Sequence, residues 1–137
     1  MKTIETADCR YWLDDSTIVH MEFAPGTVID LETARRCTKI GDEHFPQQPR
    51  LLLISLEGVK SVDRVARTYF AGFPGPTAVA LLGLSPVARV IGAVFQGLRR
   101  QTTYPVRAFA SEEAAVTWLK TFASTPETEP ADRKNED

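Results

Sequence analysis

The sequence predicts an α/β fold in which a mixed, mostly parallel sheet carries helices in the order β-β-α-β-α-β-α-β-α. Three observations support this prediction. Two continuous apolar runs, at 51–56 and 78–84, have the length of strands that are covered on both faces. Each run is followed by a segment of helical periodicity, and an alternating segment near the start has the pattern of a one-sided hairpin. Strands that alternate with helices favour parallel pairing through right-handed crossovers.

The composition is typical of one soluble globular domain. The 137 residues are 43% hydrophobic, and 18 acidic against 16 basic side chains give a formal net charge of −2. This balance argues against a nucleic-acid partner, because nucleic-acid binders usually carry a clear basic excess. No apolar run approaches the ~20 residues that cross a bilayer, so we expect no membrane span and a cytoplasmic location. We expect a single domain over 1–123 and, because 124–137 is rich in proline and charge, a disordered C-terminal tail.

The first elements are predicted to be a hairpin and a helix. In RYWLDDSTIVHMEF, two strand-like runs flank Asp14 and Asp15, and the second run alternates apolar with polar side chains. Asp30 is a suitable N-cap for a helix that ends near 45–46. The inward positions of this helix would be Leu31, Ala34, Cys37 or Thr38, and Gly41.

The middle of the chain is predicted to hold the central strand and a second helix. LLLISLEG is a continuous apolar run bounded by turn residues, as a central strand requires. Ser61 would cap the following helix, and Gly72 would end it. The inward face of that helix would consist of Val62, Val65, Ala66, Tyr69 and Phe70.

Two more strand and helix pairs complete the prediction. TAVALLGL repeats the buried-strand pattern, and Ser85 followed by Pro86 predicts the start of a helix. The buried stripe of this helix would be Val87, Val90, Ile91, Val94 and Leu98. VRAFA would be the last strand, and Ser111 would cap the last helix. The buried face of the last helix would be Ala115, Trp118, Leu119 and Phe122.

The order of these elements resembles the STAS superfamily, the fold of bacterial anti-sigma-factor antagonists. The resemblance covers most of residues 8–122 and includes the initial hairpin, the buried strand ending in LEGV, the helix start near VD and the closing FASEEAAVTWL. It implies a non-enzymatic regulatory module that binds a protein partner. Antagonists of this type carry an aspartate and then a phosphorylatable serine at the start of the helix after the central strand. Here Asp63 matches the aspartate but Arg64 replaces the serine, so a phosphoserine switch is not expected.

The predicted working surface is the edge at which the parallel strands end and the next helices begin. Unpaired N–H groups and helix dipoles favour anions at this edge. Arg64 and Arg67 lie one turn apart and are expected to face outward together. The candidate partner- or anion-binding residues are Lys60, Ser61, Asp63, Arg64, Arg67 and Arg89. The alternative is an ordinary solvated face on which Asp63 and Glu57 neutralise the basic side chains.

Four aromatic residues exceed what the predicted helices need for their core faces. They are Tyr69, Phe70, Phe73 and Phe95. Exposed aromatic side chains would favour contact with another subunit, most simply in a two-fold homodimer. Enclosed, they would line a pocket with an arginine at its mouth. The second arrangement supports the alternative function, a carrier or sensor of a small lipid or organic anion.

No motif indicates catalysis, a metal or a nucleotide. His20 and His44 belong to no recognisable triad or HExxH spacing, and the glycines form neither GxGxxG nor a Walker loop. Cys9 and Cys37 have no metal-ligand spacing and are expected to stay reduced. We therefore expect no enzymatic activity, no metal site and no cofactor.

Overall fold

The computed structural model describes residues 3–46, 48–98 and 100–123, so the predicted tail at 124–137 lies outside the described residues. The strands of the main sheet are β1 (Thr3–Glu5), β2 (Cys9–Leu13), β3 (Ile18–Phe23), β5 (Leu51–Ser55), β7 (Ala78–Leu82) and β8 (Val106–Phe109). Within the described residues these six strands are ordered β1-β2-β3-β5-β7-β8. Pairing is antiparallel from β1 to β3 and parallel from β3 to β8. The predicted fold class is confirmed.

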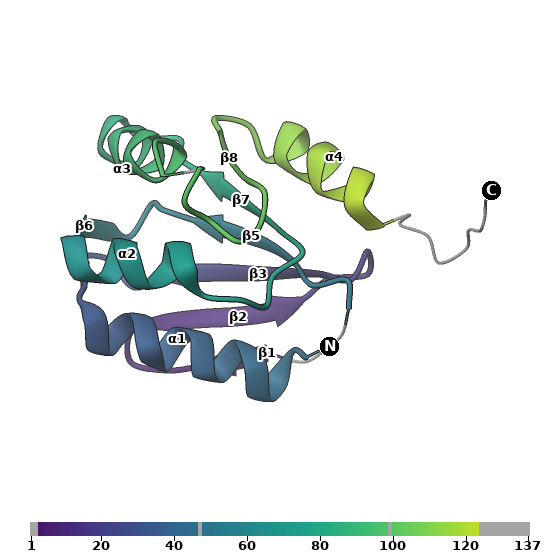
Figure 1. Ribbon diagram of the computed structural model, residues 1–137, viewed down its shortest axis with the longest axis horizontal. Coiled ribbons are helices and arrows are strands. Elements are labelled where there is room, and N and C mark those ends of the chain that lie inside the picture. Colours follow the sequence, from purple (N-terminus) through teal and green to yellow (C-terminus); the bar gives the residue numbers. More distant parts are fainter. Residues whose placement is uncertain (1–2, 47, 99, 124–137) are drawn as a thin grey trace.

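The helices divide unequally between the two faces of the sheet (Figure 1). They are α1 (Leu31–His44), α2 (Arg64–Gly72), α3 (Pro86–Gln96) and α4 (Glu112–Ala123). The first three bury small side chains against one face, in a core that includes Tyr11, Met21 and Val79. On the other face, α4 packs over β5, β7 and β8, where Ala115 and Leu119 are fully buried.

The two strands predicted to be central are central. β5 pairs in parallel with β7 in the middle of the sheet, with Leu51 opposite Ala78. All five residues of β7 are buried, because helices cover both of its faces. The turns that follow β5 and β7 therefore open on the same edge of the sheet, as the prediction of a working surface requires.

Three predicted helix caps are confirmed, each by a hydrogen bond to the first turn. Oδ1 of Asp30 accepts from the N–H of Thr33 at 2.8 Å. At α3, Oγ of Ser85 accepts from the N–H of Ala88 at 3.2 Å. At α4, Oγ of Ser111 accepts from the N–H of Ala114 at 3.3 Å. Satisfying these N–H groups fixes where each helix begins.

The region after β5 differs from the prediction. β6 (Val59–Val62) pairs in parallel with β4 (Thr27–Ile29) in a separate two-stranded sheet. Ser61 lies within β6 and so does not cap α2, which instead begins after Asp63. The close approach of the segment before β6 to the end of β3 depends on Gly58, since a Cβ there would lie 2.1 Å from the carbonyl oxygen of Phe23.

The outward residues of α2 and α3 also differ from the prediction. Val87, Val90 and Val94 were expected in the core but are 57%, 65% and 41% exposed. Val65 of α2 is 58% exposed. The helix α3 ends at Gln96, so the predicted position Leu98 lies beyond it.

Candidate functional site

The most exposed apolar feature of α3 is the valine stripe, which we define as Val87, Val90 and Val94. Spacings of three and four residues place these side chains on one face of the helix. Leu84, just before the helix, is also 51% exposed. Neighbouring exposed aliphatic groups on a protein surface are typical of a contact surface.

The valine stripe faces outward because small residues form the inner face of α3. Ala88 is 1% exposed, and a Cβ placed on Gly92 would lie 3.4 Å from Cβ of Ala108 and 3.6 Å from Cδ1 of Leu56. The helix therefore lies close to the sheet, and side chains larger than alanine have little room there. The orientation follows from where small residues occur, which a search for aliphatic periodicity overlooks.

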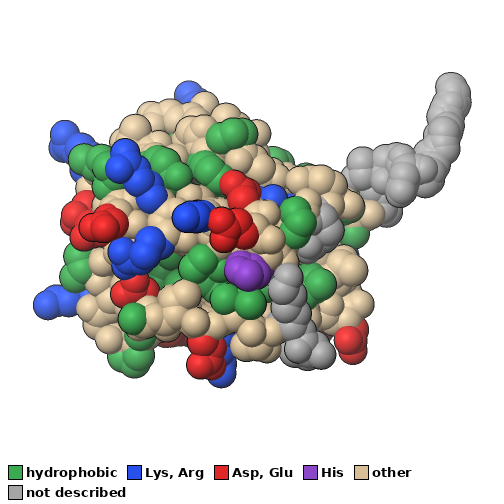
Figure 2. All heavy atoms as spheres, turned by 90° about the horizontal axis from the view of Figure 1, so that it is seen from below, with side chains coloured by type: hydrophobic (Ala, Val, Ile, Leu, Met, Phe, Trp, Pro, Cys, Tyr) green, Lys and Arg blue, Asp and Glu red, His purple; other side chains and the backbone are tan. Residues whose placement is uncertain are grey.

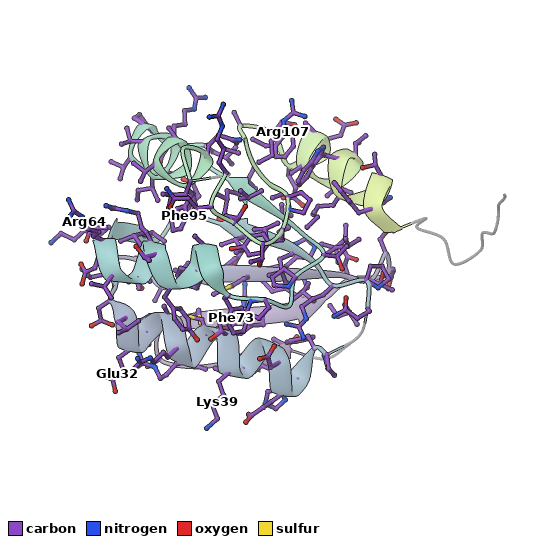
Figure 3. All side chains as sticks on the ribbon, in the orientation of Figure 1. Glu32, Lys39, Arg64, Phe73, Phe95 and Arg107 are labelled. Carbon is purple, nitrogen blue, oxygen red and sulfur yellow. The ribbon has the colours of Figure 1, made fainter. Side chains whose placement is uncertain are left out.

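Basic residues lie at the same edge, and we call Lys60, Arg64 and Arg89 the basic rim. All three are exposed, on β6, α2 and α3 respectively, and β6 packs against α3. Figure 3 shows Arg64 at the outer end of α2, pointing away from the sheet. The prediction that Arg67 faces outward with Arg64 is wrong, because Arg67 is half-buried and its Nη1 donates to the carbonyl of Val62 at 3.0 Å.

The anion position predicted at the start of α3 is occupied by a side chain of the protein itself. Oε2 of Glu57 accepts from the N–H of Leu84 at 2.5 Å and from the N–H of Ser85 at 3.3 Å. These bonds, that of Leu84 first, hold the pKa of Glu57 below its usual value. An external phosphate or carboxylate would have to displace this carboxylate.

The other predicted rim residues have structural surroundings. Asp63 occupies the N-cap position of α2, but its side chain makes no capping bond. Its backbone N–H donates to the carbonyl of Ile29 at 2.9 Å, which ties the start of α2 to β4. Ser61 is exposed in β6. The structure thus brings the predicted residues to one region but leaves mainly the basic rim available for contact.

The four predicted aromatic residues lie on the face of the sheet that α1, α2 and α3 cover. Phe70, Phe73 and Phe95 line an apolar cavity of about 100 Å³ between the sheet and α1, α2 and α3. The rings of Phe70 and Phe95 are 6.2 Å apart, edge to face. Figure 3 labels Phe95 and Phe73 on opposite sides of the α2 ribbon. Tyr69 does not line the cavity. Its hydroxyl is hydrogen-bonded to Oγ1 of Thr38 at 2.8 Å.

His20, which belongs to no catalytic motif, has a clear partner. Nε2 of His20 lies 2.7 Å from Oδ2 of Asp14, and its ring stacks on Trp12 at 4.9 Å. Burial alone would raise the pKa of Asp14, but hydrogen bonds from His20 and from the N–H of Ile18 outweigh it, and the pKa is lowered. In the described part of the chain no three His, Cys, Asp or Glu side chains are grouped to hold a metal ion.

The two cysteines are buried, free and close together. Sγ of Cys9 lies 3.9 Å from Sγ of Cys37 and 3.0 Å from the hydroxyl of Tyr11. The bond from Cys37 lowers the pKa of Cys9, whereas the bond to Cys9 and burial raise the pKa of Cys37.

Charges of both signs are mixed on the face shown in Figure 2, with apolar groups between them. No extended area of one sign appears on that face. Among the described residues, no helix has both the length and the apolar character that crossing a membrane requires.

Comparisons with known proteins give a fold and a family. A search of curated proteins found no match. An uncharacterised protein of the DUF3478 family from Shewanella loihica PV-4, which has a SpoIIAA-like fold, is similar at a TM-score of 0.50 and 13% identity, over 86% of this chain and 90% of that one. This likeness supports the predicted fold of the anti-sigma-factor antagonists. A protein of unknown function from Arthrobacter sp. FB24 is 27% identical over 86% of this chain and 97% of that one, but its TM-score of 0.34 is too low to support a structural argument.

The family is shown by a match over most of the chain. The family described as a domain of unknown function, DUF7793, matches residues 11–123. These residues include most of β2, the main sheet from β3 onward, all the helices described above, the valine stripe and the basic rim. The chain belongs to the DUF7793 family.

Proposed function

We propose that this protein is a non-enzymatic regulatory module that binds a partner protein through α3 and the basic rim. The observation that supports the proposal is the exposed valine stripe, on a helix whose small inner residues already satisfy its packing on the sheet. Helices with aliphatic side chains on two faces commonly use the outer face for contact with another chain. The resemblance to antagonist domains supports the same function.

The partner that fits this surface is an amphipathic segment with acidic flanks. Aliphatic side chains spaced by three and four residues accept apolar anchors from a partner helix. Lys60, Arg64 and Arg89 are exposed on β6, α2 and α3, at the edge of the sheet where α3 begins, and favour negative charge on the approaching chain. Such charges would mainly accelerate association and fix orientation, whereas the apolar contact would supply most of the affinity.

Regulation by phosphorylation at the start of α2 is not part of this proposal. Arg64 replaces the serine of the antagonist pattern, and Ser61 lies in β6. The surface would therefore keep its positive charge. Incubation with an anti-sigma-type serine kinase should leave Ser61 unmodified, and stoichiometric phosphate on it would contradict this part of the proposal.

A cytoplasmic location belongs to the same proposal. The free thiols of Cys9 and Cys37 lie near each other without being joined, which fits a reducing compartment.

Site-specific crosslinking in the protein's own cells tests the proposal. A photoreactive amino acid at position 90 should yield an adduct with one acidic partner, and the same group at Lys120 of α4, which is also exposed, should not. Reversing Arg64 and Arg89 to glutamate should reduce the adduct at position 90. Equal adducts from both positions, or an adduct only with a second copy of this chain, would overturn the proposal.

A further inference from the structure

The cavity between the sheet and the helices α1, α2 and α3 is larger than the voids of an ordinary core. It measures about 100 Å³ and is lined mainly by aliphatic and aromatic side chains of the sheet, α2 and α3, including Ile54, Val79, Leu81, Phe70 and Phe95. Native interiors rarely leave voids much larger than a water molecule. Apolar cavities of about 150 Å³ stay dry and accept small hydrocarbons such as benzene. The size and lining therefore fit a small apolar molecule.

One charged residue lines this cavity, and one of its hydrogen-bond donors has no partner. Among the described lining residues Arg50 alone is charged, and it is only 7% exposed. Its Nη1 donates to Oδ1 of Asp42 at 2.8 Å, while its buried Nε has no acceptor within the described part of the chain. A buried donor without an acceptor is costly, so its persistence requires a reason.

The surroundings hold Arg50 in place. Its backbone N–H donates to Oγ1 of Thr77 at 2.9 Å, and its carbonyl accepts from the N–H of Thr77 at 2.8 Å. A Cβ at Gly75 would lie 3.1 Å from Nη1 of Arg50, so glycine there lets the chain approach the guanidinium closely. The residue is fixed by β5, α1 and the loop before β7.

A bound water does not readily account for the free donor. An ordered buried water usually needs two to four polar partners. Two hydroxyl groups of the lining already have partners: that of Tyr104 donates to the carbonyl of Phe70 at 2.8 Å, and that of Thr38 is hydrogen-bonded to the hydroxyl of Tyr69. A single free N–H on a residue of an otherwise mainly hydrocarbon lining matches a molecule with one acceptor oxygen better than it matches water.

We propose that this cavity binds a small, mainly apolar molecule that carries one uncharged acceptor oxygen, such as a ketone, and that Nε of Arg50 donates to this oxygen. Asp42 already balances the charge of the guanidinium, which leaves no unbalanced positive charge to attract a carboxylate. The site lies apart from the valine stripe, and binding in it is independent of a partner protein.

Three probes of similar shape test the proposal by NMR titration of the whole chain, followed at the methyl groups of Ile54, Val79 and Leu81. Cyclohexanone should shift these methyl signals and bind about tenfold more tightly than methylenecyclohexane, which lacks the oxygen. Cyclohexanecarboxylate should bind no more tightly than the ketone. No shifts with the ketone, equal affinity for the ketone and the alkene, or preference for the carboxylate would overturn the proposal.

Variants then assign the recognition to Arg50. The substitution Asp42→Asn, at a half-exposed position, leaves the guanidinium unbalanced and should turn the preference toward cyclohexanecarboxylate. Arg50→Met should remove the advantage of the ketone over the alkene, and Leu81→Phe should fill the cavity and abolish binding of both probes. If Arg50→Met does not fold, the titration of Asp42→Asn with the ketone and the carboxylate tests the role of Arg50. An unchanged preference in Asp42→Asn would overturn the role of Arg50.

Discussion

The helices α3 and α4 have similar apolar content but meet the sheet in opposite ways. On α4, Leu119 is fully buried against the sheet, and the aromatic side chains of Trp118 and Phe122 extend that contact. On α3, Ala88 and Gly92 are buried at the sheet, Ile91 is partly buried, and the valine stripe points to solvent. The helix α4, which covers its face alone, thus buries a leucine at its closest contact, whereas α3, which shares its face with α1 and α2, fully buries only small residues.

This difference teaches that aliphatic periodicity finds a stripe but does not say which way the stripe faces. On α3, two stripes compete, one large and one small. The layer beneath α3 already contains large side chains such as that of Leu56, just after β5, which fill it and leave room at the closest contact only for small residues. The larger stripe is left for a contact outside the domain.

The largest expected effect lies on α4. Leu119→Ala should lower the free energy of unfolding by about 2–5 kcal/mol, because it removes a fully buried side chain and leaves a cavity. Lys120→Ala, one residue along and exposed, should change it by less than about 0.5 kcal/mol. Urea unfolding of both variants measures the difference, and equal losses would show that α4 does not pack through Leu119.

A smaller effect is expected at the close contact of α3. Gly92→Leu should lower the free energy of unfolding by about 1–3 kcal/mol, because the larger side chain would be forced against Ala108 and Leu56. Gly92→Ala should be neutral or slightly stabilising, since a methyl group meets only ordinary contacts and alanine favours the helix. Thermal and urea unfolding distinguish the two variants. If leucine is tolerated as well as alanine, α3 does not approach the sheet through Gly92.

The start of α3 should show a modest dependence on pH. The pKa of Glu57 is lowered in the folded state by bonds from Leu84 and Ser85, so its stabilising contribution is present above pH ~4.5 and is lost as the pH falls through the folded pKa. Because Glu57 is exposed and screened by solvent, we expect no more than about 0.5–1 kcal/mol. The free energies of unfolding of Glu57→Gln and of the native chain, measured at several pH values, should converge in acid. A difference that persists unchanged at the lowest pH would contradict the assignment.

Local signals in the sequence were sufficient for much of the fold. The long apolar runs of β5 and β7 and the caps Asp30, Ser85 and Ser111 depend on neighbouring residues alone, and each was predicted. The short strands β1, β4 and β6 were missed. Strands of three or four residues carry little periodicity, and their pairing depends on distant segments.

The candidate site was predicted only in outline. Lys60, Arg64 and Arg89 lie where strands end and the next helices begin, which predicted that they share one edge. The aromatic excess indicated a pocket around Phe70 and Phe95. An arginine was expected at that pocket, but nothing in the sequence singled out Arg50, which precedes β5 like any charged residue at a strand end. Its burial depends on Asp42 and on the loop around Gly75, which only the folded chain brings together.

The valine stripe faces solvent and is therefore free to bind a partner. The free energy of unfolding of Val90→Asp tests it most directly, since the two residues have similar helix propensities and differ mainly in what burial would cost. We predict a change of less than about 0.5 kcal/mol relative to the native chain. A loss of more than about 2 kcal/mol would contradict the claim, because it would mean that Val90 is buried in the folded protein.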